Sequence, residues 1–317
     1  EFIDQRGERT RCVILNTIKV ATLVHQELKQ RFAVPNLFLL HGLMIPLHKK
    51  AAVAYLKDLL RDSSKPVTVV STQILEAGVN VSFELMIRAL ANLPSLVQAG
   101  GRVNRHAVQS EQPRQLILFD FLRHGRTETR SFIYDRNHGA LTDELLARQE
   151  HWTESEIEKL VAEYYEGLLR LSRHEAKLDA IRSAFSGNWP KLAEYEPFGG
   201  DMFRLPLFVP WMAPTVLQPY VPDIYRKLLK ELNVGSPEQI YERYRERSGR
   251  RDRETYAESR KWSILFYHHV LNLPVKAALR YASKDDYLEN RIPMLKDSQA
   301  YGEHGLLLPD DLTHRII

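Results

Sequence analysis

Residues 67–80 read VTVVSTQILEAGVN, in which four strand-forming residues run directly into a polar segment. An apolar run with little polar alternation is typical of a parallel strand that is covered on both faces. Residues 93–105 read LPSLVQAGGRVNR, and the proline near the start of this segment favours the first turn of a helix. The stretch therefore predicts a buried strand, a loop that carries polar groups, and a helix.

The same alternation of short apolar runs and amphipathic segments continues on both sides of this stretch. Val20, Leu23, Val24 and Leu28 recur at spacings of three and four, which indicates one buried helix face. Strand–helix alternation favours a doubly wound α/β domain with a parallel sheet, whose ligands bind at the carboxyl ends of the strands. The expected strands are 12–15, 37–40, 67–70, 85–89 and 116–119, and the expected helices are about 20–28, 47–60 and a segment that opens at Pro94.

The pattern changes at about Asn137. Thr153 and Glu156 are spaced as a capping box, in which each side chain satisfies a free amide of the other at the start of a helix. The elements expected after this point are a long helix to about Phe185, a strand within 203–209, a helix from Pro237 and a helix over about 255–273. The predicted domains are an α/β domain over residues 1–136, a long linker helix region over 137–190 and a mainly helical C-terminal domain over 191–317.

Composition and charge place few limits on function. The 317 residues are 44% hydrophobic, with a net charge of +4 and a pI of about 9.0, which suits two globular domains and permits a polyanionic partner without requiring one. The single cysteine, Cys12, excludes an internal disulfide framework and suits a reducing cytoplasm. No stretch approaches the roughly 20 apolar residues of a membrane span, so no membrane partner is expected. The chain begins Glu1-Phe2 without an initiator methionine, and we expect it to be part of a longer protein.

The histidines and a basic segment invite further hypotheses. None of the 12 histidines has paired-ligand spacing, so no metal site is predicted, and His268 and His269 are interpreted as packing residues within an apolar helix. Residues 241–253 combine arginines with two tyrosines and could bind nucleic acid by charge and stacking. Acidic residues are interleaved there, so a solvated helix with internal ion pairs is an equally natural interpretation.

Two arginines at the end of the segment 93–105 could carry phosphate chemistry. Arg102 and Arg105 are three residues apart and so share one face of a helix, and glycines just before them allow close approach of a ligand. A guanidinium group keeps its proton and presents forked donors that match phosphate oxygens, and such groups accelerate phosphoryl transfer by roughly 10³–10⁵. For a lone Arg-x-x-Arg pattern, a pair of arginines on a solvated helix is the ordinary alternative.

The order and spacing of Ser-Thr-Gln at 71–73, Glu-x-Gly at 76–78 and Gln-x-x-Gly-Arg-x-x-Arg at 98–105 resemble motifs V and VI of superfamily-two helicases. The resemblance implies a RecA-like motor domain whose arginines face a triphosphate held by another motor domain. Ala99 stands where relatives often have a further arginine, and many relatives have an acid in place of asparagine at 80. The implied residues are Gln98, Arg102 and Arg105 for catalysis, Gly78, Asn80 and Gly101 for nucleotide binding, and Thr72 and Gln73 for contact with the nucleic-acid backbone.

Two other strand ends suit contacts with nucleic acid. Asn16 and Thr17 follow the first expected strand and resemble motif IV; they suit a phosphate at a helix N-terminus, although either could instead cap that helix. His41 and Gly42 follow the second strand, where relatives have a strand-contacting loop, although a lone histidine is more often structural. Together with Thr72, these residues would track one strand by its phosphates, which favours sequence-independent binding.

Within the superfamily, the sequence resembles the CRISPR-associated helicase-nuclease of type I systems over most of its length. Residues 71–78 and 93–105 are similar to that family's motifs V and VI, and residues 203–210 stand in the place of a short strand after its linker helix. Residues 301–306, YGEHGL, resemble its closing segment. In that family a metal-dependent nuclease domain and a first motor domain come before this part, and the protein is recruited to a guide-RNA surveillance complex.

The resemblance implies an incomplete motor. The sequence contains no His-Asp dipeptide, no Gly-x-x-x-x-Gly-Lys-Ser/Thr loop and no Asp-Glu-x-His box, so ATP and Mg²⁺ are expected to be held mainly by the missing first motor domain. We expect the C-terminal half of an ATP-dependent single-stranded-DNA helicase that does not hydrolyse ATP alone. Its expected partners are single-stranded DNA, the missing motor and nuclease domains, and a CRISPR surveillance complex. The alternative is a non-catalytic nucleic-acid-binding module with a helicase-like fold.

Overall fold

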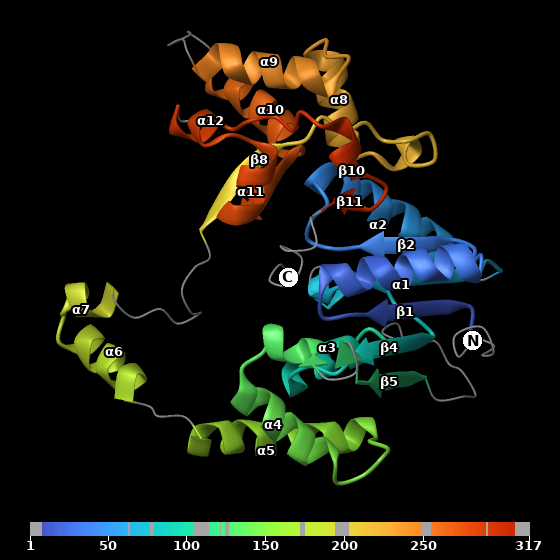
Figure 1. Ribbon diagram of the computed structural model, residues 1–317, viewed down its shortest axis with the longest axis vertical. Helices are drawn as coiled ribbons and strands as arrows, with labels where there is room; N and C mark the ends of the chain where they lie inside the picture. The colour runs from blue at the N-terminus through green and yellow to red at the C-terminus, as the bar shows by residue number, and fades with distance from the viewer. Residues whose placement is uncertain are drawn as a thin grey trace. The chain divides into compact units, whose positions relative to one another are not determined.

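The computed structural model describes residues 8–62, 64–76, 79–103, 114–120, 122–123, 127–171, 175–193, 203–248, 255–289 and 291–307 (Figure 1). Its strands are β1 (Thr10–Ile14), β2 (Leu37–Leu40), β3 (Val67–Ser71), β4 (Leu85–Ala89), β5 (Gln115–Phe119), β6 (Leu122–Arg123), β7 (Thr127–Glu128), β8 (Arg204–Phe208), β9 (Val270–Pro274), β10 (Tyr301–Gly302) and β11 (Gly305–Leu306). Its α-helices are α1 (Ile18–Arg31), α2 (Pro46–Arg61), α3 (Leu93–Gly100), α4 (Arg136–Leu146), α5 (Glu154–Leu171), α6 (Glu175–Phe185), α7 (Trp189–Ala193), α8 (Asp223–Glu231), α9 (Pro237–Ser248), α10 (Tyr256–Tyr267), α11 (Val275–Tyr281) and α12 (Lys284–Leu288). Short 3-10 helices cover Gln73–Leu75, Thr129–Phe132, Gln218–Tyr220 and Ser298–Ala300.

The chain forms two compact units. The first unit comprises residues 1–90, 95–133 and 204–317, and the second unit comprises residues 91–94 and 134–203. The division into domains at residues 136 and 190 stays a prediction. Within the described ranges, no helix combines the length and the apolar character that crossing a membrane requires.

Five parallel strands form the main sheet of the first unit, in the order β2-β3-β1-β4-β5. The central strand β1 places Cys12 opposite Val69 of β3 on one side and opposite Met86 of β4 on the other. Each of the five strands expected from the sequence is present, and α1, α2 and α3 stand where helices are expected. The predicted doubly wound parallel sheet is therefore confirmed.

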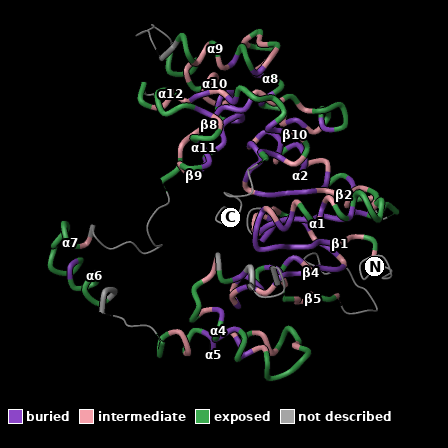
Figure 2. Tube along the Cα trace, in the orientation of Figure 1, coloured by how far each residue is buried: buried purple, intermediate pink, exposed green. Residues whose placement is uncertain are grey.

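Both faces of this sheet are covered, which explains why its strands lack polar alternation. Successive residues of a strand point to opposite faces. Cys12 and Ile14 pack with α2 and α3 on one face, through Leu56 and Ala99, and Val13 packs with α1 on the other. Figure 2 shows the sheet of the first unit as largely buried. The apolar residues on both sides of each strand thus become a two-layered core.

The strand order also fixes where a ligand can bind. The chain runs from β1 to β2 and β3 on one side, and then crosses to β4 and β5 on the other side of β1. Ligands of open α/β sheets bind at such a switch point, at the carboxyl ends of the strands. The loops that follow β1 and β3, together with the end of β4, are therefore the part of the fold best placed to form a site.

In the C-terminal part of the first unit, the prediction of a helix over residues 255–273 is wrong for the second half of this range. The helix α10 ends at Tyr267, and Val270–Pro274 forms β9, which pairs antiparallel with β8. Buried backbone groups of β8 need hydrogen-bond partners, and this requirement overrides the helical pattern of the sequence. The two histidines consequently lie in the turn between α10 and β9. His269 is buried there and lies within hydrogen-bond distance of the Tyr225 hydroxyl (2.6 Å), as expected for a packing residue.

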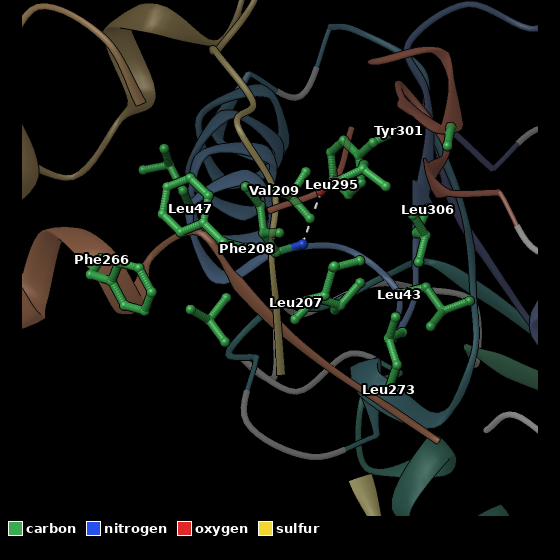
Figure 3. Packing of buried hydrophobic residues seen from close by; sticks show 14 of the residues in the cluster. Leu43, Leu47, Leu207, Phe208, Val209, Phe266, Leu273, Leu295, Tyr301 and Leu306 are labelled. Atoms are coloured by element: carbon green, nitrogen blue, oxygen red, sulfur yellow. Dashed lines mark hydrogen bonds between the residues drawn. The ribbon is translucent and has the colours of Figure 1, made fainter. Parts of the chain in front are cut away.

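One apolar core joins the region after β2 to the C-terminal part of the first unit. Leu43 and Leu47 lie in it together with residues of β8, β9 and β11 (Figure 3). The buried members of the cluster that belong to these strands are Leu207, Phe208, Val270, Leu271, Leu273 and Leu306. The C-terminal residues therefore share this cluster with residues of α2 and of the loop before it, whereas the two faces of the sheet are covered by separate clusters.

In the second unit, α4 packs closely against α5. A Cβ atom on Gly167 of α5 would lie 2.7 Å from the Leu141 side chain, so glycine permits this approach. The Glu156 carboxylate accepts a hydrogen bond from the Thr153 amide (2.8 Å), which is one half of the predicted capping box. The long helix expected to reach Phe185 is described as α5 and α6, and residues 172–174 between them lie outside the described residues.

The hairpin β10–β11 docks on the loop that follows β2. The amide of Leu306 donates to the Leu43 carbonyl (2.9 Å), and the amide of Ile45 donates to the Tyr301 hydroxyl (2.9 Å). Gly305 has a positive φ of 71°, and a Cβ atom there would lie 2.7 Å from the Leu43 carbonyl oxygen. The docking of this hairpin thus requires glycine at position 305.

We expect Gly305→Ala to lower the free energy of unfolding by about 1–3 kcal/mol, because the new methyl group meets backbone and the φ angle is unfavourable for alanine. Urea denaturation followed by circular dichroism measures the change. The matched control is Gly302→Ala in the same hairpin, where an added Cβ meets no heavy atom within 4 Å. Equal stability of the two variants would contradict the docking described here.

Candidate functional site

The loops that follow β1 and β3 meet the end of β4 at the switch point of the sheet. The Asn16 side chain donates from Nδ2 to the Leu90 carbonyl just after β4 (2.7 Å). Its backbone carbonyl accepts a hydrogen bond from Gln73 Nε2 in the loop after β3 (3.2 Å). Two segments predicted from separate motifs are therefore in direct contact.

Thr17 lies at the N-terminus of α1 and caps this helix. Its side-chain oxygen accepts a hydrogen bond from the Val20 amide (3.3 Å), and both Asn16 and Thr17 are buried. The cap stabilises the helix end and leaves the free amides of the first turn facing the same edge of the sheet. Thr17 therefore caps α1, which is one of the two roles that the sequence allows for it.

A buried ion pair connects these loops. Arg88, at the end of β4, donates from Nε to Glu76 Oε1 (2.7 Å) and from Nη1 to Asn16 Oδ1 (2.5 Å) and the Ala89 carbonyl (2.8 Å). Glu76 Oε2 accepts a hydrogen bond from the Ser95 hydroxyl in the first turn of α3 (2.5 Å). The side chains of Arg88 and Glu76 are 0% and 4% exposed, so both charges are out of reach of solvent.

The Glu76 carboxyl group accepts the hydrogen bonds expected of an ionised carboxylate. Burial raises the pKa of Glu76 above its ordinary value, and the neighbouring Arg88 guanidinium and the Ser95 hydroxyl offset part of this rise. Both carboxyl oxygens accept hydrogen bonds, as an ionised carboxylate does. Charge-assisted hydrogen bonds of this kind are roughly twice as strong as neutral ones, and they compensate the cost of burying the two charges.

Arg102 holds the loop after β3 from the other side. It is 9% exposed, and its guanidinium donates from Nη2 to the Glu76 carbonyl (2.9 Å) and from Nη1 to the Val79 carbonyl (2.6 Å). The Phe83 amide in turn donates to the Arg102 carbonyl (3.1 Å). Arg102 thus fixes the backbone of the loop that contains Glu76, while its own backbone lies beside Phe83, just before the start of β4.

The remaining residues of the predicted site differ in exposure. Gln98 at the end of α3 and Gly101 just after it are exposed, as is Asn80. Thr72 is buried at the end of β3, and its hydroxyl makes no capping bond to the 3-10 helix that follows. Gly78 and Arg105 lie outside the described residues.

His41 is fully buried at the end of β2 and belongs to the hairpin contact. Its Nδ1 accepts a hydrogen bond from the Leu43 amide (3.1 Å), so Nε2 carries the proton and donates to the His304 carbonyl (2.8 Å). Gly42 beside it is half-buried. Both ring nitrogens of His41 are therefore occupied by backbone groups of the first unit.

Further histidines pack at the same contact. His48 stacks on Trp211 (ring centroids 4.3 Å apart) and lies 3.1 Å from the Tyr301 hydroxyl, and His25 meets His304 edge to face. Burial lowers the pKa of His25, His41 and His48 to about 4. Within the part of the chain that the structure describes, no three His, Cys, Asp or Glu side chains are grouped to hold a metal ion.

The basic segment at 241–253 is described as far as residue 248, and its tyrosines serve packing. The Tyr241 hydroxyl donates to the Ile292 carbonyl (3.0 Å), and the Tyr244 hydroxyl accepts from the Ile292 amide (3.1 Å). Arg243 pairs with Glu246 (3.1 Å) and lies over the Trp262 ring. These contacts are those of the alternative interpretation, a solvated helix with internal ion pairs.

Sequence reasoning missed the residues that tie the site together. Arg88 lies in the middle of an apolar run, where a charge has no evident role, and Ser95 looks like an ordinary helix-start residue. The one available signal was an arginine inside a strand predicted to be buried on both faces, because such a charge requires a buried partner. Glu76 belongs to a motif of the sequence, but the motif does not indicate that Arg88 is its partner.

Residues 7–108 match the family model of the C-terminal region of the CRISPR-associated nuclease/helicase Cas3. Over 313 residues the chain is 24% identical to the Cas3 of Methanothermobacter thermautotrophicus. This alignment covers 95% of this chain and 35% of that relative. A stretch of 62 residues, 20% of this chain and 7% of that relative, is 42% identical to the Cas3 of Haloferax volcanii.

Solved structures resemble the chain at the level of the fold. The crystal structure of T. fusca Cas3 with AMPPNP superposes with a TM-score of 0.55 at 18% identity, over 87% of this chain and 33% of that one. A structure named "CRISPR RNA-guided surveillance complex, pre-nicking" gives a TM-score of 0.55 at 18% identity, over 97% of this chain and 39% of that one. The predicted resemblance to the C-terminal helicase part of these proteins is confirmed.

Acidification is expected to destabilise the fold because several histidines are buried in their neutral form. The ordinary pKa of 6.5 applies to the unfolded chain, whereas burial lowers the folded value to about 4 for His41 and His48. As the pH falls from 6.5 toward 4, the unfolded state binds protons that the folded state does not, so stability present above pH 6.5 is lost. The free energy of unfolding should fall by up to about 1.4 kcal/mol per pH unit for each such histidine.

Urea denaturation across this pH range measures the slope. His41→Gln retains one acceptor and one donor but does not titrate, so its slope should be shallower than that of the wild type. His151→Gln, at an exposed position after α4, is the matched control for the loss of a histidine. A slope for His41→Gln that equals the wild-type slope would show that this histidine is not buried in its neutral form.

Proposed function

We propose that this chain, a relative of the C-terminal helicase part of CRISPR-associated nuclease/helicases, supplies the second motor half of an ATP-dependent single-stranded-DNA translocase. The observation that carries the proposal is the convergence of Asn16, Glu76 and the first turn of α3 at the switch point of a parallel sheet. ATP and Mg²⁺ would be held mainly by the first motor domain of the full-length protein. The chain spans 35% of the length of its Methanothermobacter relative, which leaves room for that domain.

On the nucleotide side, Gln98, Arg102 and Arg105 are proposed to face the triphosphate. Gln98 and Gly101 are exposed, so a nucleotide bound elsewhere can reach this segment, whereas Arg102 itself is 9% exposed. Arg102 gives two hydrogen bonds to loop carbonyls, and the planar fork of a guanidinium can hold a carbonyl along one edge and a phosphate along another. Gly78 and Asn80 would lie near the same nucleotide.

On the nucleic-acid side, the proposal assigns contacts with phosphates to the carboxyl ends of β1 and β3. Asn16 and Thr17 use their side chains within the protein, so their contribution would come from the free backbone amides at the start of α1. Thr72 supplies a hydroxyl beside this helix end, with Gln73 next to it. His41 and Gly42 would shape the neighbouring loop through its backbone.

The assembly that uses this motor is proposed from similarity. One structure that resembles the chain is named as a CRISPR RNA-guided surveillance complex. We infer that the full-length protein, including its nuclease domain, acts with a complex of this kind.

In the full-length protein, Arg105→Ala and Arg102→Ala should each lower the rate of ATP hydrolysis by roughly 10³-fold or more, because each removes a guanidinium that stabilises the transferring phosphoryl group. Phosphate release in the presence of single-stranded DNA measures the rate, and fluorescence anisotropy should show that DNA binding survives. Arg114→Ala is the matched control, since Arg114 pairs with Glu84 (3.3 Å) at the opposite edge of the sheet.

Normal turnover in both arginine variants would defeat the assignment of these residues. A full-length protein that binds nucleic acid without any ATP hydrolysis would favour the non-catalytic binding module instead.

Thr72→Val should weaken the binding of single-stranded DNA by about fivefold to tenfold, the effect of one lost hydrogen bond to a phosphate, at unchanged melting temperature. Thr22→Val in α1 is the control, because the Thr22 hydroxyl bonds to the Ile18 carbonyl of its own helix (3.0 Å). Anisotropy titrations of both variants at one salt concentration provide the comparison. Equal affinity of the two variants would remove Thr72 from the DNA-binding surface.

A further inference from the structure

The pair Glu76–Arg88 stands between the two sides of the proposed site. Through Nη1, Arg88 holds Asn16, which belongs to the nucleic-acid side. Through Glu76 and Ser95, it holds the first turn of α3, the helix that contains Gln98 and ends two residues before Arg102. One guanidinium is therefore linked to both halves of the proposed motor surface.

A second path passes through the backbone of the same glutamate. Its side chain binds Arg88, while its carbonyl oxygen accepts a hydrogen bond from Arg102 Nη2 (2.9 Å). Gln73, three residues earlier, binds the Asn16 carbonyl (3.2 Å). The loop after β3 is therefore hydrogen-bonded both to the segment just before α1 and to the guanidinium of Arg102.

Stability alone does not account for this arrangement. Both side chains are buried, and an apolar pair of similar volume is often as stable as a buried ion pair, or more so. An apolar pair, however, could not orient an amide oxygen, a hydroxyl and a backbone carbonyl at the same time. The polar contacts of the pair therefore indicate that it positions these neighbouring groups.

We propose that Glu76 and Arg88 are positioning residues that couple DNA binding to ATP hydrolysis, an inference that rests on the proposed function. DNA phosphates bound at the ends of β1 and β3 set the loop that contains Glu76, and the contacts of this glutamate transmit its position to the first turn of α3 and to Arg102. Stimulation of ATP hydrolysis by single-stranded DNA then depends on the pair, whereas the binding of ATP does not.

The test compares single and double variants of the full-length protein. Arg88→Met and Glu76→Leu alone each leave a buried unpaired charge and should melt at clearly lower temperature than the wild type. The double variant removes both charges and should recover a melting temperature close to that of the wild type. Its DNA-stimulated kcat should nevertheless stay about 10- to 100-fold low, as expected for misplaced catalytic groups, with a KM for ATP within about twofold of the wild-type value.

A double variant with restored melting temperature and wild-type stimulation would overturn the proposal, because the pair would then serve packing alone. If the double variant does not fold, the Arg88→Lys variant tests the proposal instead. Lysine retains the charge opposite Glu76 but cannot bridge the carboxylate, Asn16 and the Ala89 carbonyl together. A stable Arg88→Lys protein with full stimulation would equally overturn it.

Amide hydrogen exchange separates this inference from the proposed function. In Arg88→Lys, residues 16–18 and 73–76 should exchange faster together with residues 95–98, while the strands β2 and β3 retain their protection. If the wild type shows no DNA-stimulated hydrolysis, the proposed function fails and the exchange pattern alone decides whether the pair couples these segments. The control for both readouts is Lys261→Gln with Glu231→Gln, an ion pair between α10 and α8.

Discussion

A carboxylate and a guanidinium that lie out of reach of water must satisfy each other, and this constraint organises the carboxyl edge of the sheet. The Glu76 side chain is satisfied only when the loop after β3 lies against the end of β4, where Arg88 is fully buried. The remaining donors of Arg88 then fix Asn16 and the Ala89 carbonyl. Loops that come from distant parts of the sequence acquire one common geometry because one buried charge requires it.

The topology of the sheet makes this geometry possible. Since β1 lies between β3 and β4, the loop after β1 has the loop after β3 on one side and the end of β4 on the other. The two apolar layers around the strands exclude water from their ends, which raises the cost of any unpaired charge there. Rigid packing and a polar edge are thus produced by the same five strands, as binding sites on α/β sheets require.

The sequence allowed the strands, the switch-point loops and the family resemblance to be predicted, because these follow from local apolar runs and from motif spacing. The network around Arg88 could not be predicted, since its partners become neighbours only when β4 pairs with β1. The strand Val270–Pro274 was missed for a related reason: its conformation is set by the need of β8 for a partner. For Thr17 the sequence allows both capping and phosphate binding and favours the cap, and the position of its hydroxyl shows that it caps α1.

The contact between the loop after β2 and the hairpin β10–β11 has a consequence for synthesis on the ribosome. Ile45 and the Tyr301 hydroxyl that holds its amide are 256 residues apart in the chain. The parallel strands, all of which lie before residue 120, can pair as soon as they have left the ribosome. The loop at residues 41–45 acquires its final hydrogen bonds only when the hairpin emerges, so this loop reaches its final structure after residue 306 has been translated.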